Sequence, residues 1–153
     1  SVNDVPALRQ ALTDAKANSH GMLYLADNAG ETVFDRALIV SLDVDVTYAV
    51  KGGPVLNDAT RNDALQAGLA SVATVIETGD NAPGTLLART SADFQRRFAE
   101  AKVIIAKGQA NYETLSPGDP RIFFVLKAKC PVIAQDLGVE VGAMVVKQGQ
   151  TEG

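Results

Sequence analysis

The chain has 153 residues, 46% hydrophobic and 21% charged, so it is long enough for one ordinary domain with a buried core. Its formal net charge of −4 argues against a general nucleic-acid-binding protein, because such proteins are usually basic. A single histidine argues against histidine-dependent hydrolase and zinc chemistry, and no apolar run reaches the ~18 residues of a membrane span.

Helical and strand-like apolar patterns alternate along the chain. In chain order they predict helix 6–18, strand 22–26, helix 31–42, strand 46–50, helix 58–67, strand 73–76, helix 91–101, and strands 103–106, 122–126, 132–134 and 144–146. Ser91 suits the cap of the last helix. This alternation predicts one domain over residues 1–153, with a three-layer α/β/α Rossmann-like fold and a mostly parallel sheet.

Polar residues follow several of the predicted strands. Asp27 and Asn28 follow the first strand, Asn57 and Asp58 the second, and residues 107–111 the fourth. Ligands of parallel sheets bind outside the carboxyl ends of the strands. We therefore expect these side chains to converge on one edge of the sheet.

The segment Asp27-Asn28-Ala29-Gly30-Glu31 joins a strand to a helix. A purely structural interpretation is available, in which Asn28 caps the helix, Gly30 permits the turn and Glu31 completes a capping-box-like pair. A cap does not require Asp27, however, and a carboxylate beside an amide oxygen suits a hard cation. Backbone N–H groups at the helix start would also favour a phosphate.

Asp58 has two interpretations on sequence alone, as a helix N-cap or as a metal ligand. If the first two strands are neighbours, ~4.8 Å apart, then Asp27, Asn28 and Asp58 can reach one ion together. Lys107 is a compact charge suited to phosphate, and Gly108 beside it lets backbone approach closely, although a surface lysine before a loop is the commoner case. The lysines of residues 127–130 give a weaker indication of the same kind.

Some familiar signatures are misleading or missing. Residues 43–47 match the DxDxT pattern of haloacid-dehalogenase-type phosphatases, but these aspartates precede a strand instead of ending one. We therefore expect Asp43 and Asp45 at the opposite edge of the sheet from Asp27. No GxGxxG or GxxxxGK[ST] sequence is present, so dinucleotide and P-loop nucleotide sites lack their usual motifs.

Four segments resemble a known family. They are LYLADNAGETVFDRALI (23–39), GGPVLNDATRNDALQAG (52–68), AKGQANYETL (106–115) and FFVLKAKCPVIA (123–134). In this order they look like the successive motifs of the damage-control phosphatases, long labelled domain of unknown function eighty-nine. The stand-alone archaeal and bacterial branch is the most similar.

The resemblance implies a Rossmann-like core that uses a divalent cation (Mn, Co, Ni or Mg) to hydrolyse small phosphorylated metabolites. Matched to the family motifs, Asp27, Asn28 and Asp58 would bind the metal. Lys107 would contact phosphate, and Glu31, Asn57 and Asn111 would line the site. Family members usually carry a helical segment before this core. The resemblance thus implies the C-terminal core of a longer architecture, whose pocket is completed by an N-terminal helical segment or an oligomer.

These residues favour metal-assisted hydrolysis, with water as the attacking group and with Asp27, Asn28, Asp58 and Lys107 as the catalytic set. A non-catalytic module that binds a phosphometabolite is the first alternative. A methyltransferase is disfavoured, because DNAGE replaces a glycine-rich cofactor loop after the first strand. The single cysteine and the absence of a signal-like N-terminus lead us to expect a cytoplasmic protein without nucleic-acid or membrane partners.

Overall fold

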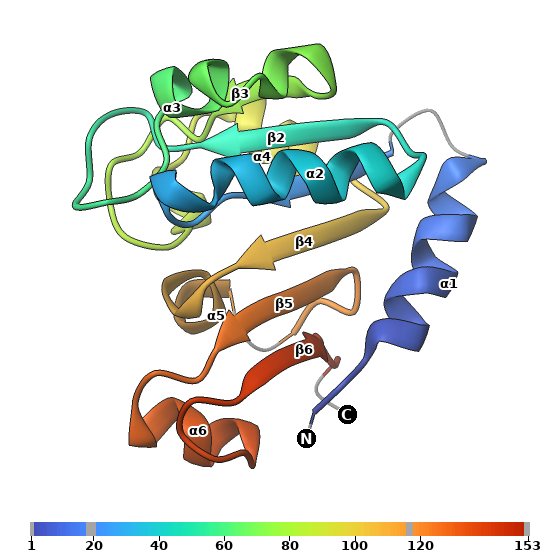
Figure 1. Cartoon of the computed structure of the whole chain (residues 1–153), viewed down its shortest axis with the longest axis vertical. Coiled ribbons are helices and arrows are strands. Elements are labelled where there is room, and N and C mark those ends of the chain that lie inside the picture. Colours follow the sequence, from blue (N-terminus) through green and yellow to red (C-terminus); the bar gives the residue numbers. More distant parts are fainter. Residues whose placement is uncertain (1, 18–20, 116–117, 152–153) are drawn as a thin grey trace.

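A computed structural model describes residues 2–17, 21–115 and 118–151 of the chain (Figure 1). Within these ranges six strands form one sheet in the order β3-β2-β1-β4-β5-β6, and only β6 runs antiparallel to its neighbour. The strands are β1 (Met22–Leu25), β2 (Val46–Val50), β3 (Thr74–Glu77), β4 (Val103–Lys107), β5 (Ile122–Lys127) and β6 (Met144–Gln148).

Helices cover both faces of the sheet, which confirms the predicted three-layer α/β/α fold. One face packs against α1 (Val5–Lys16), α2 (Thr32–Leu42) and α3 (Arg61–Gln66). The other packs against α4 (Ala92–Glu100), α5 (Gln109–Leu115) and α6 (Pro131–Leu137). Short 3-10 helices are η1 (Ala29–Glu31), η2 (Leu69–Ser71) and η3 (Leu87–Arg89).

Strand β1 is buried on both faces, which explains its continuous apolar sequence. Leu23 and Leu25 belong to the core beneath α4, α5 and α6, whereas Met22 and Tyr24 face the core beneath α1, α2 and α3. Tyr24 stacks on Tyr48 of β2 with ring centroids 5.3 Å apart. The central strands are therefore fixed from both sides, and so are the residues that follow them.

The structure corrects several predicted elements. Residues 132–134, predicted as a strand, lie inside α6, which starts at Pro131 and ends at the left-handed Gly138. A proline in the first turn and a glycine after the last are typical of helix ends. Residues 109–115 form a helix where no helix or strand was predicted, and the helix predicted over 58–67 begins at Arg61. The last residue of predicted helix 6–18 lies outside the described residues.

The strand order reverses direction between β1 and β4, since β2 and β3 lie on one side of this pair and β5 and β6 on the other. In open parallel sheets, ligands bind at such a switch point, outside the carboxyl ends of the strands. Asp27 is the second residue after β1, and Lys107 is the last residue of β4. The topology thus indicates the same edge as the sequence patterns do.

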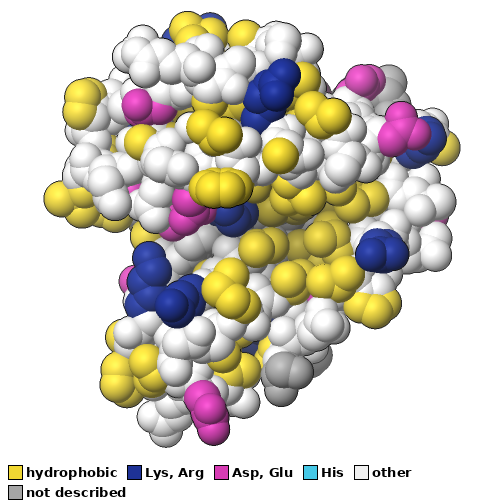
Figure 2. Space-filling model, in the orientation of Figure 1, with side chains coloured by type: hydrophobic (Ala, Val, Ile, Leu, Met, Phe, Trp, Pro, Cys, Tyr) yellow, Lys and Arg dark blue, Asp and Glu magenta, His cyan; other side chains and the backbone are white. Residues whose placement is uncertain are grey.

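Helices α1 and α2 do not cover their sheet face completely. Between them lies a hollow of about 770 Å³, visible as an apolar surface in Figure 2. Its walls include Leu8 and Leu12 of α1, Leu38 of α2, and Ile105 and Val125 of the sheet. Across the described ranges, no helix is long and apolar enough to cross a membrane.

Candidate functional site

Backbone pairing brings the three predicted metal ligands together. Strands β1 and β2 are neighbours, as expected, and the pairing continues beyond them as an antiparallel bridge between Asn28 and Asp58. The Ala59 N–H donates to the carbonyl oxygen of Asp27 at 2.8 Å, and the Ala29 N–H donates to that of Asn57 at 2.8 Å. Residues 27–29 and 57–59 therefore lie side by side at the carboxyl edge.

Neither Asn28 nor Asp58 acts as a helix cap. Helix α3 is capped by Thr60, whose side chain accepts from the Asp63 N–H while the Asp63 carboxylate accepts from the Thr60 N–H in a capping box. The Asn28 side chain makes no capping hydrogen bond, and its Nδ2 donates to Glu31 Oε1 at 3.2 Å. The amide oxygen, the atom that would bind a metal, is then on the other side of the amide group.

Gly108 holds the Asp27 carboxylate against the end of β4. Its φ is +84°, and a Cβ added there would lie 2.8 Å from Asp27 Oδ1 and closer still to Oδ2. Only glycine accommodates both this backbone conformation and this close approach. The carboxylate therefore bridges the ends of β1 and β4, at the switch point of the sheet.

The carboxylates of this edge oppose one another's ionisation. Burial, together with the charges of Glu31 and Asp58, raises the pKa of Asp27 to about 6. Burial also raises the pKa of Asp58, against the opposing charge of Lys51. Two carboxylates and an amide oxygen are donors that a hard divalent cation prefers, and a cation would relieve this repulsion. No group of three His, Cys, Asp or Glu side chains that could hold a metal is found among the described residues, so a metal set at this edge would need a donor of another type, such as the amide of Asn28.

Lys107 is bound by two carboxylates, one at the end of η1 and one in the first turn of α2. Its Nζ donates to Glu31 Oε2 at 2.6 Å and to Asp35 Oδ1 at 3.3 Å. Burial would lower the pKa of Lys107, but the hydrogen bonds and charges of these carboxylates raise it. Burial likewise opposes charge on Glu31, whose pKa is nevertheless lowered by Lys107. A charged ammonium is thus fixed beside Asp27.

Asp35 is a residue of the candidate site that the sequence did not indicate. It is almost fully buried, and its Oδ1 and Oδ2 accept hydrogen bonds from the hydroxyls of Tyr24 at 2.5 Å and Tyr48 at 2.7 Å. Burial and the neighbouring Asp35 raise the pKa of both tyrosines, which keeps them as donors. Asp35 lies one helical turn after Glu31, which directly precedes α2, and this spacing could have indicated that the two carboxylates lie close together.

Lys51 was also missed, although it directly follows β2. Its ammonium is buried and donates to the carbonyl oxygens of Ala82, at 2.8 Å, and Gly84. Burial lowers the pKa of Lys51, against the opposing charges of Asp58, Asp80 and Asp27. Lys51 therefore ties the loop after β3 to the carboxyl edge, behind the predicted metal ligands.

The two remaining predicted contacts, Asn57 and Asn111, lie in different environments. Asn57 is exposed next to Asp58. Asn111 is buried, and its amide bonds to the Thr85 hydroxyl at 2.8 Å and to the Lys107 carbonyl oxygen at 2.8 Å. A substrate contact from Asn111 would therefore require one of these internal hydrogen bonds to break.

Backbone N–H groups after Asn28 were expected to bind a phosphate, and two of them form hydrogen bonds within the protein. The Ala29 N–H donates to Asn57, and the Glu31 N–H donates to the Asn28 carbonyl oxygen at 3.0 Å. The second of these hydrogen bonds belongs to the 3-10 turn η1, whereas the first joins the two segments of the carboxyl edge. A phosphate bound by these two N–H groups would have to replace these bonds, and the predicted phosphate contact from this segment stays a prediction.

A cleft of about 330 Å³ opens at this edge between α2 and β5. Asp27, Glu31 and Lys107 line its inner part, and Phe34 and Met144 form an apolar rim with exposed fractions of 76% and 68%. The helical segment or partner copy expected to complete the pocket lies outside this structure and stays a prediction.

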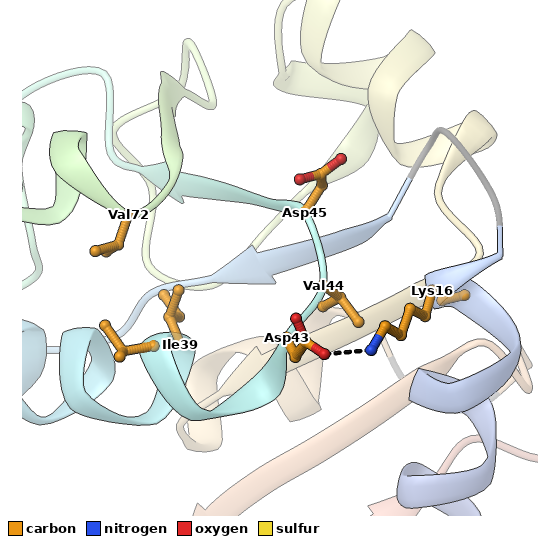
Figure 3. A pocket seen from close by; sticks show the side chains of 8 residues that line it. Lys16, Ile39, Asp43, Val44, Asp45 and Val72 are labelled. Atoms are coloured by element: carbon orange, nitrogen blue, oxygen red, sulfur yellow. Dashed lines mark hydrogen bonds and ion pairs between the residues drawn. The ribbon is translucent and has the colours of Figure 1, made fainter.

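The DxDxT aspartates lie where the sequence predicted, at the opposite edge from Asp27. Asp43 ends α2 in the left-handed conformation and pairs with Lys16, and Asp45 precedes β2 (Figure 3). They border a hollow of about 420 Å³ at the amino ends of the strands. The haloacid-dehalogenase interpretation is therefore not supported by their position.

Comparisons with known proteins agree with this geometry. The damage-control phosphatase ARMT1-like domain matches residues 1–145. A damage-control phosphatase from Pyrococcus horikoshii is 47% identical over 132 residues, which are 83% of this chain and 46% of that protein. One from Archaeoglobus fulgidus is 37% identical over 151 residues, 95% of this chain and 50% of that protein.

The fold has a close counterpart among solved structures. A crystal structure of a DUF89 family protein from Pyrococcus horikoshii superposes with a TM-score of 0.90 at 42% identity, covering 97% of this chain and 53% of that one. The chain thus spans about half the length of the curated relatives it matches.

Proposed function

This chain belongs to the damage-control phosphatase ARMT1-like (DUF89) family, and on that premise we propose that it forms the core of a metal-dependent phosphatase acting on small phosphorylated metabolites. The observation that carries the proposal is the meeting of Asp27, Asn28 and Asp58 at the switch point, beside the charged Lys107. The names of the relatives support the same activity.

In this proposal Asp27, Asn28 and Asp58 hold a divalent cation such as Mn, Co, Ni or Mg. Such an ion, when bound, lowers the pKa of a water molecule and neutralises charge on the phosphate. The residue types fit such an ion, because the backbones of Asn28 and Asp58 pair there and the charge of Asp58 raises the pKa of the adjacent Asp27.

The protein side chains orient the phosphate and stabilise its charge. Lys107 carries a full positive charge into the cleft, and its pairing with Glu31 and Asp35 fixes where the ammonium lies. Charge fixed in advance, where the reaction develops negative charge, is the most effective form of electrostatic catalysis. Water attacks the phosphorus, the ester P–O bond breaks, and the products are an alcohol and inorganic phosphate. Asp27 serves as a ligand in this scheme, which leaves it unavailable as a nucleophile.

A module that binds a phosphometabolite without turnover is the second candidate. The open rim at Phe34 and Met144 favours it, because an active site that stays accessible to bulk water weakens its electrostatic interactions. We propose that a helical segment or a second copy of the chain closes this side in the active form. The methyltransferase alternative gains no support from the residues at the edge.

Hydrolysis of p-nitrophenyl phosphate with Mn, Co, Ni or Mg, against an EDTA control, tests the proposal. We expect metal-dependent turnover, and a loss of about a hundred-fold or more in Asp58→Ala. Asp63→Ala is the matched control, because it removes a nearby carboxylate that serves only the α3 cap. Turnover that survives EDTA would refute the metal dependence. Phosphate binding without any turnover would favour the binding module.

A further inference from the structure

The buried side chain of Asn111 joins the carboxyl ends of β1 and β4. Its Nδ2 donates to the Lys107 carbonyl oxygen at 2.8 Å and to that of Ala26 at 3.5 Å. The backbone pairing of the two strands ends one residue earlier on each of them. Asn111 therefore links the strands where their pairing stops, next to Asp27 on one side and at Lys107 on the other.

Thr85 determines which way this amide group points. Its hydroxyl donates to Asn111 Oδ1 at 2.8 Å, and the two residues are buried, with exposed fractions of 3% and 4%. The two carbonyl oxygens require the N–H groups of the amide on their side, so Oδ1 faces away from them and needs a donor of its own. A buried amide oxygen without a donor is costly, and Thr85 provides that donor.

The loop that carries Thr85 is anchored on two sides. The buried ammonium of Lys51, directly after β2, donates to the carbonyl oxygens of Ala82, at 2.8 Å, and of Gly84. The Thr85 N–H donates to the Thr114 hydroxyl of α5 at 2.8 Å. Gly84 has a φ of +71°, and a Cβ there would collide with the backbone of α5. A path of hydrogen bonds and backbone therefore leads from the end of β2 through this loop to the ends of β1 and β4.

We propose that Thr85 is a positioning residue for the candidate site. Through Asn111 it sets the spacing between the ends of β1 and β4, and thereby the distance between Asp27 and Lys107. Metal–ligand distances tolerate errors of only about 0.2 Å, so a small change in this spacing affects ion binding. Thr85 does not line the cleft, so it acts only through its neighbours. The effect on metal binding rests on the proposed function, whereas the spacing is a property of the sheet alone.

Three variants separate the hydroxyl group from packing. Thr85→Val removes the hydroxyl but keeps a side chain of nearly the same shape, and Thr85→Ser keeps the hydroxyl but loses a methyl group. Thr90→Val is the matched control, because Thr90 is also buried and its hydroxyl donates to the Leu87 carbonyl oxygen at 2.7 Å. Both valine variants lose one buried hydrogen bond, but only Thr85→Val releases Asn111.

Amide hydrogen exchange in EDTA tests the spacing without metal. The Ala26 and Gly108 N–H groups mark the carboxyl ends of β1 and β4, the Ile104 N–H marks the amino end of β4, and all three donate to backbone carbonyl oxygens. Relative to Thr90→Val, exchange in Thr85→Val should be faster by about five- to ten-fold at Ala26 and Gly108, the effect of about one hydrogen bond, and unchanged at Ile104. Equal acceleration at both ends of β4, or none at either, would overturn the proposal.

Calorimetric titration with manganese tests the effect on the site. Wild type, Thr85→Ser and Thr90→Val should bind manganese with similar affinity, and the dissociation constant of Thr85→Val should rise by about ten-fold. The kcat for p-nitrophenyl phosphate at saturating manganese should fall in the same variant only, because Lys107 moves relative to Asp27. Equal manganese affinities in the two valine variants would refute the positioning role.

Failure of this inference differs from failure of the proposed function. If wild type neither binds manganese nor hydrolyses an ester, the metal-dependent phosphatase proposal fails, and the exchange rates at Ala26 and Gly108 alone decide whether Thr85 sets the strand spacing. If wild type is active and Thr85→Val matches it in affinity and kcat, the function stands and the positioning role is wrong.

Discussion

The contact between Gly108 and Asp27 allows the candidate metal site to be disturbed through the backbone alone. In Gly108→Ala the new Cβ would lie 2.8 Å or less from both carboxylate oxygens of Asp27, whereas non-bonded atoms need about 3.5 Å. The carboxylate must therefore move by on the order of 1 Å, several times the tolerance of about 0.2 Å for a metal–ligand distance. The left-handed backbone of Gly108 adds a strain of about 1–2 kcal/mol.

Gly138→Ala is the matched control for that strain. Gly138 also has a positive φ, +64°, but an added Cβ would meet nothing within 4 Å. In thermal unfolding with EDTA, both variants should melt lower than wild type, by about 2–4 °C for each kcal/mol lost. Manganese should raise the melting temperature of wild type and Gly138→Ala alike, and that of Gly108→Ala much less. If manganese stabilises both variants equally, Asp27 is not a ligand, or its position does not depend on Gly108.

Three further outcomes can be measured with the same protein. In Asp58→Ala the melting temperature in EDTA should be equal to or above that of wild type, because repulsion with Asp27 is relieved, while stabilisation by manganese should disappear. If manganese raises the melting temperatures of both proteins equally, Asp58 is not a ligand. In EDTA, the free energy of unfolding should fall as pH rises from about 4 to 7, because the pKa of Asp27 is about 6 in the folded state instead of 3.8. Urea titrations of Asp27→Asn should show a flatter dependence of this free energy on pH. Asp35→Asn should lower the free energy of unfolding by about 1–3 kcal/mol and also reduce kcat, whereas Tyr48→Phe should lower the free energy of unfolding by about 1 kcal/mol. Equal kcat values in these two variants would argue against a positioning role for Asp35.

The sequence was most informative about the sheet and its carboxyl edge. Long apolar runs bounded by polar residues identified β1, β2, β4 and β5, because central strands buried on both faces have a continuous apolar sequence. Once β1 and β2 are neighbours, the convergence of Asp27, Asn28 and Asp58 follows from the register. The topology of a parallel sheet thus carries much of the site geometry.

Short elements and tertiary contacts were less predictable. The run 132–134 has three apolar residues, too few to distinguish a strand period from a helical one, and its flanking Pro131 and Gly138 were the better indicators of α6. Asp58 resembled a cap because an acidic residue preceded a helical pattern, but Thr60 two residues later makes the capping box. The partners of Lys107 and Lys51 depend on how α2 and the loop after β3 pack, which local patterns do not encode.

The charges behind the candidate metal site favour a bound cation over a purely structural arrangement. A buried carboxylate is stable when a neighbouring positive charge or hydrogen-bond donors compensate it, as the tyrosines and Lys107 do for Asp35. The charge of Asp58 adds to the burial that raises the pKa of Asp27, and the nearby lysines are hydrogen-bonded to other groups, Lys107 to Glu31 and Lys51 to two loop carbonyl oxygens. Two carboxylates in this situation either keep a proton near neutral pH or share a cation. The second state gives the edge a use for Asn28, whose amide oxygen is a cation ligand and whose side chain caps no helix.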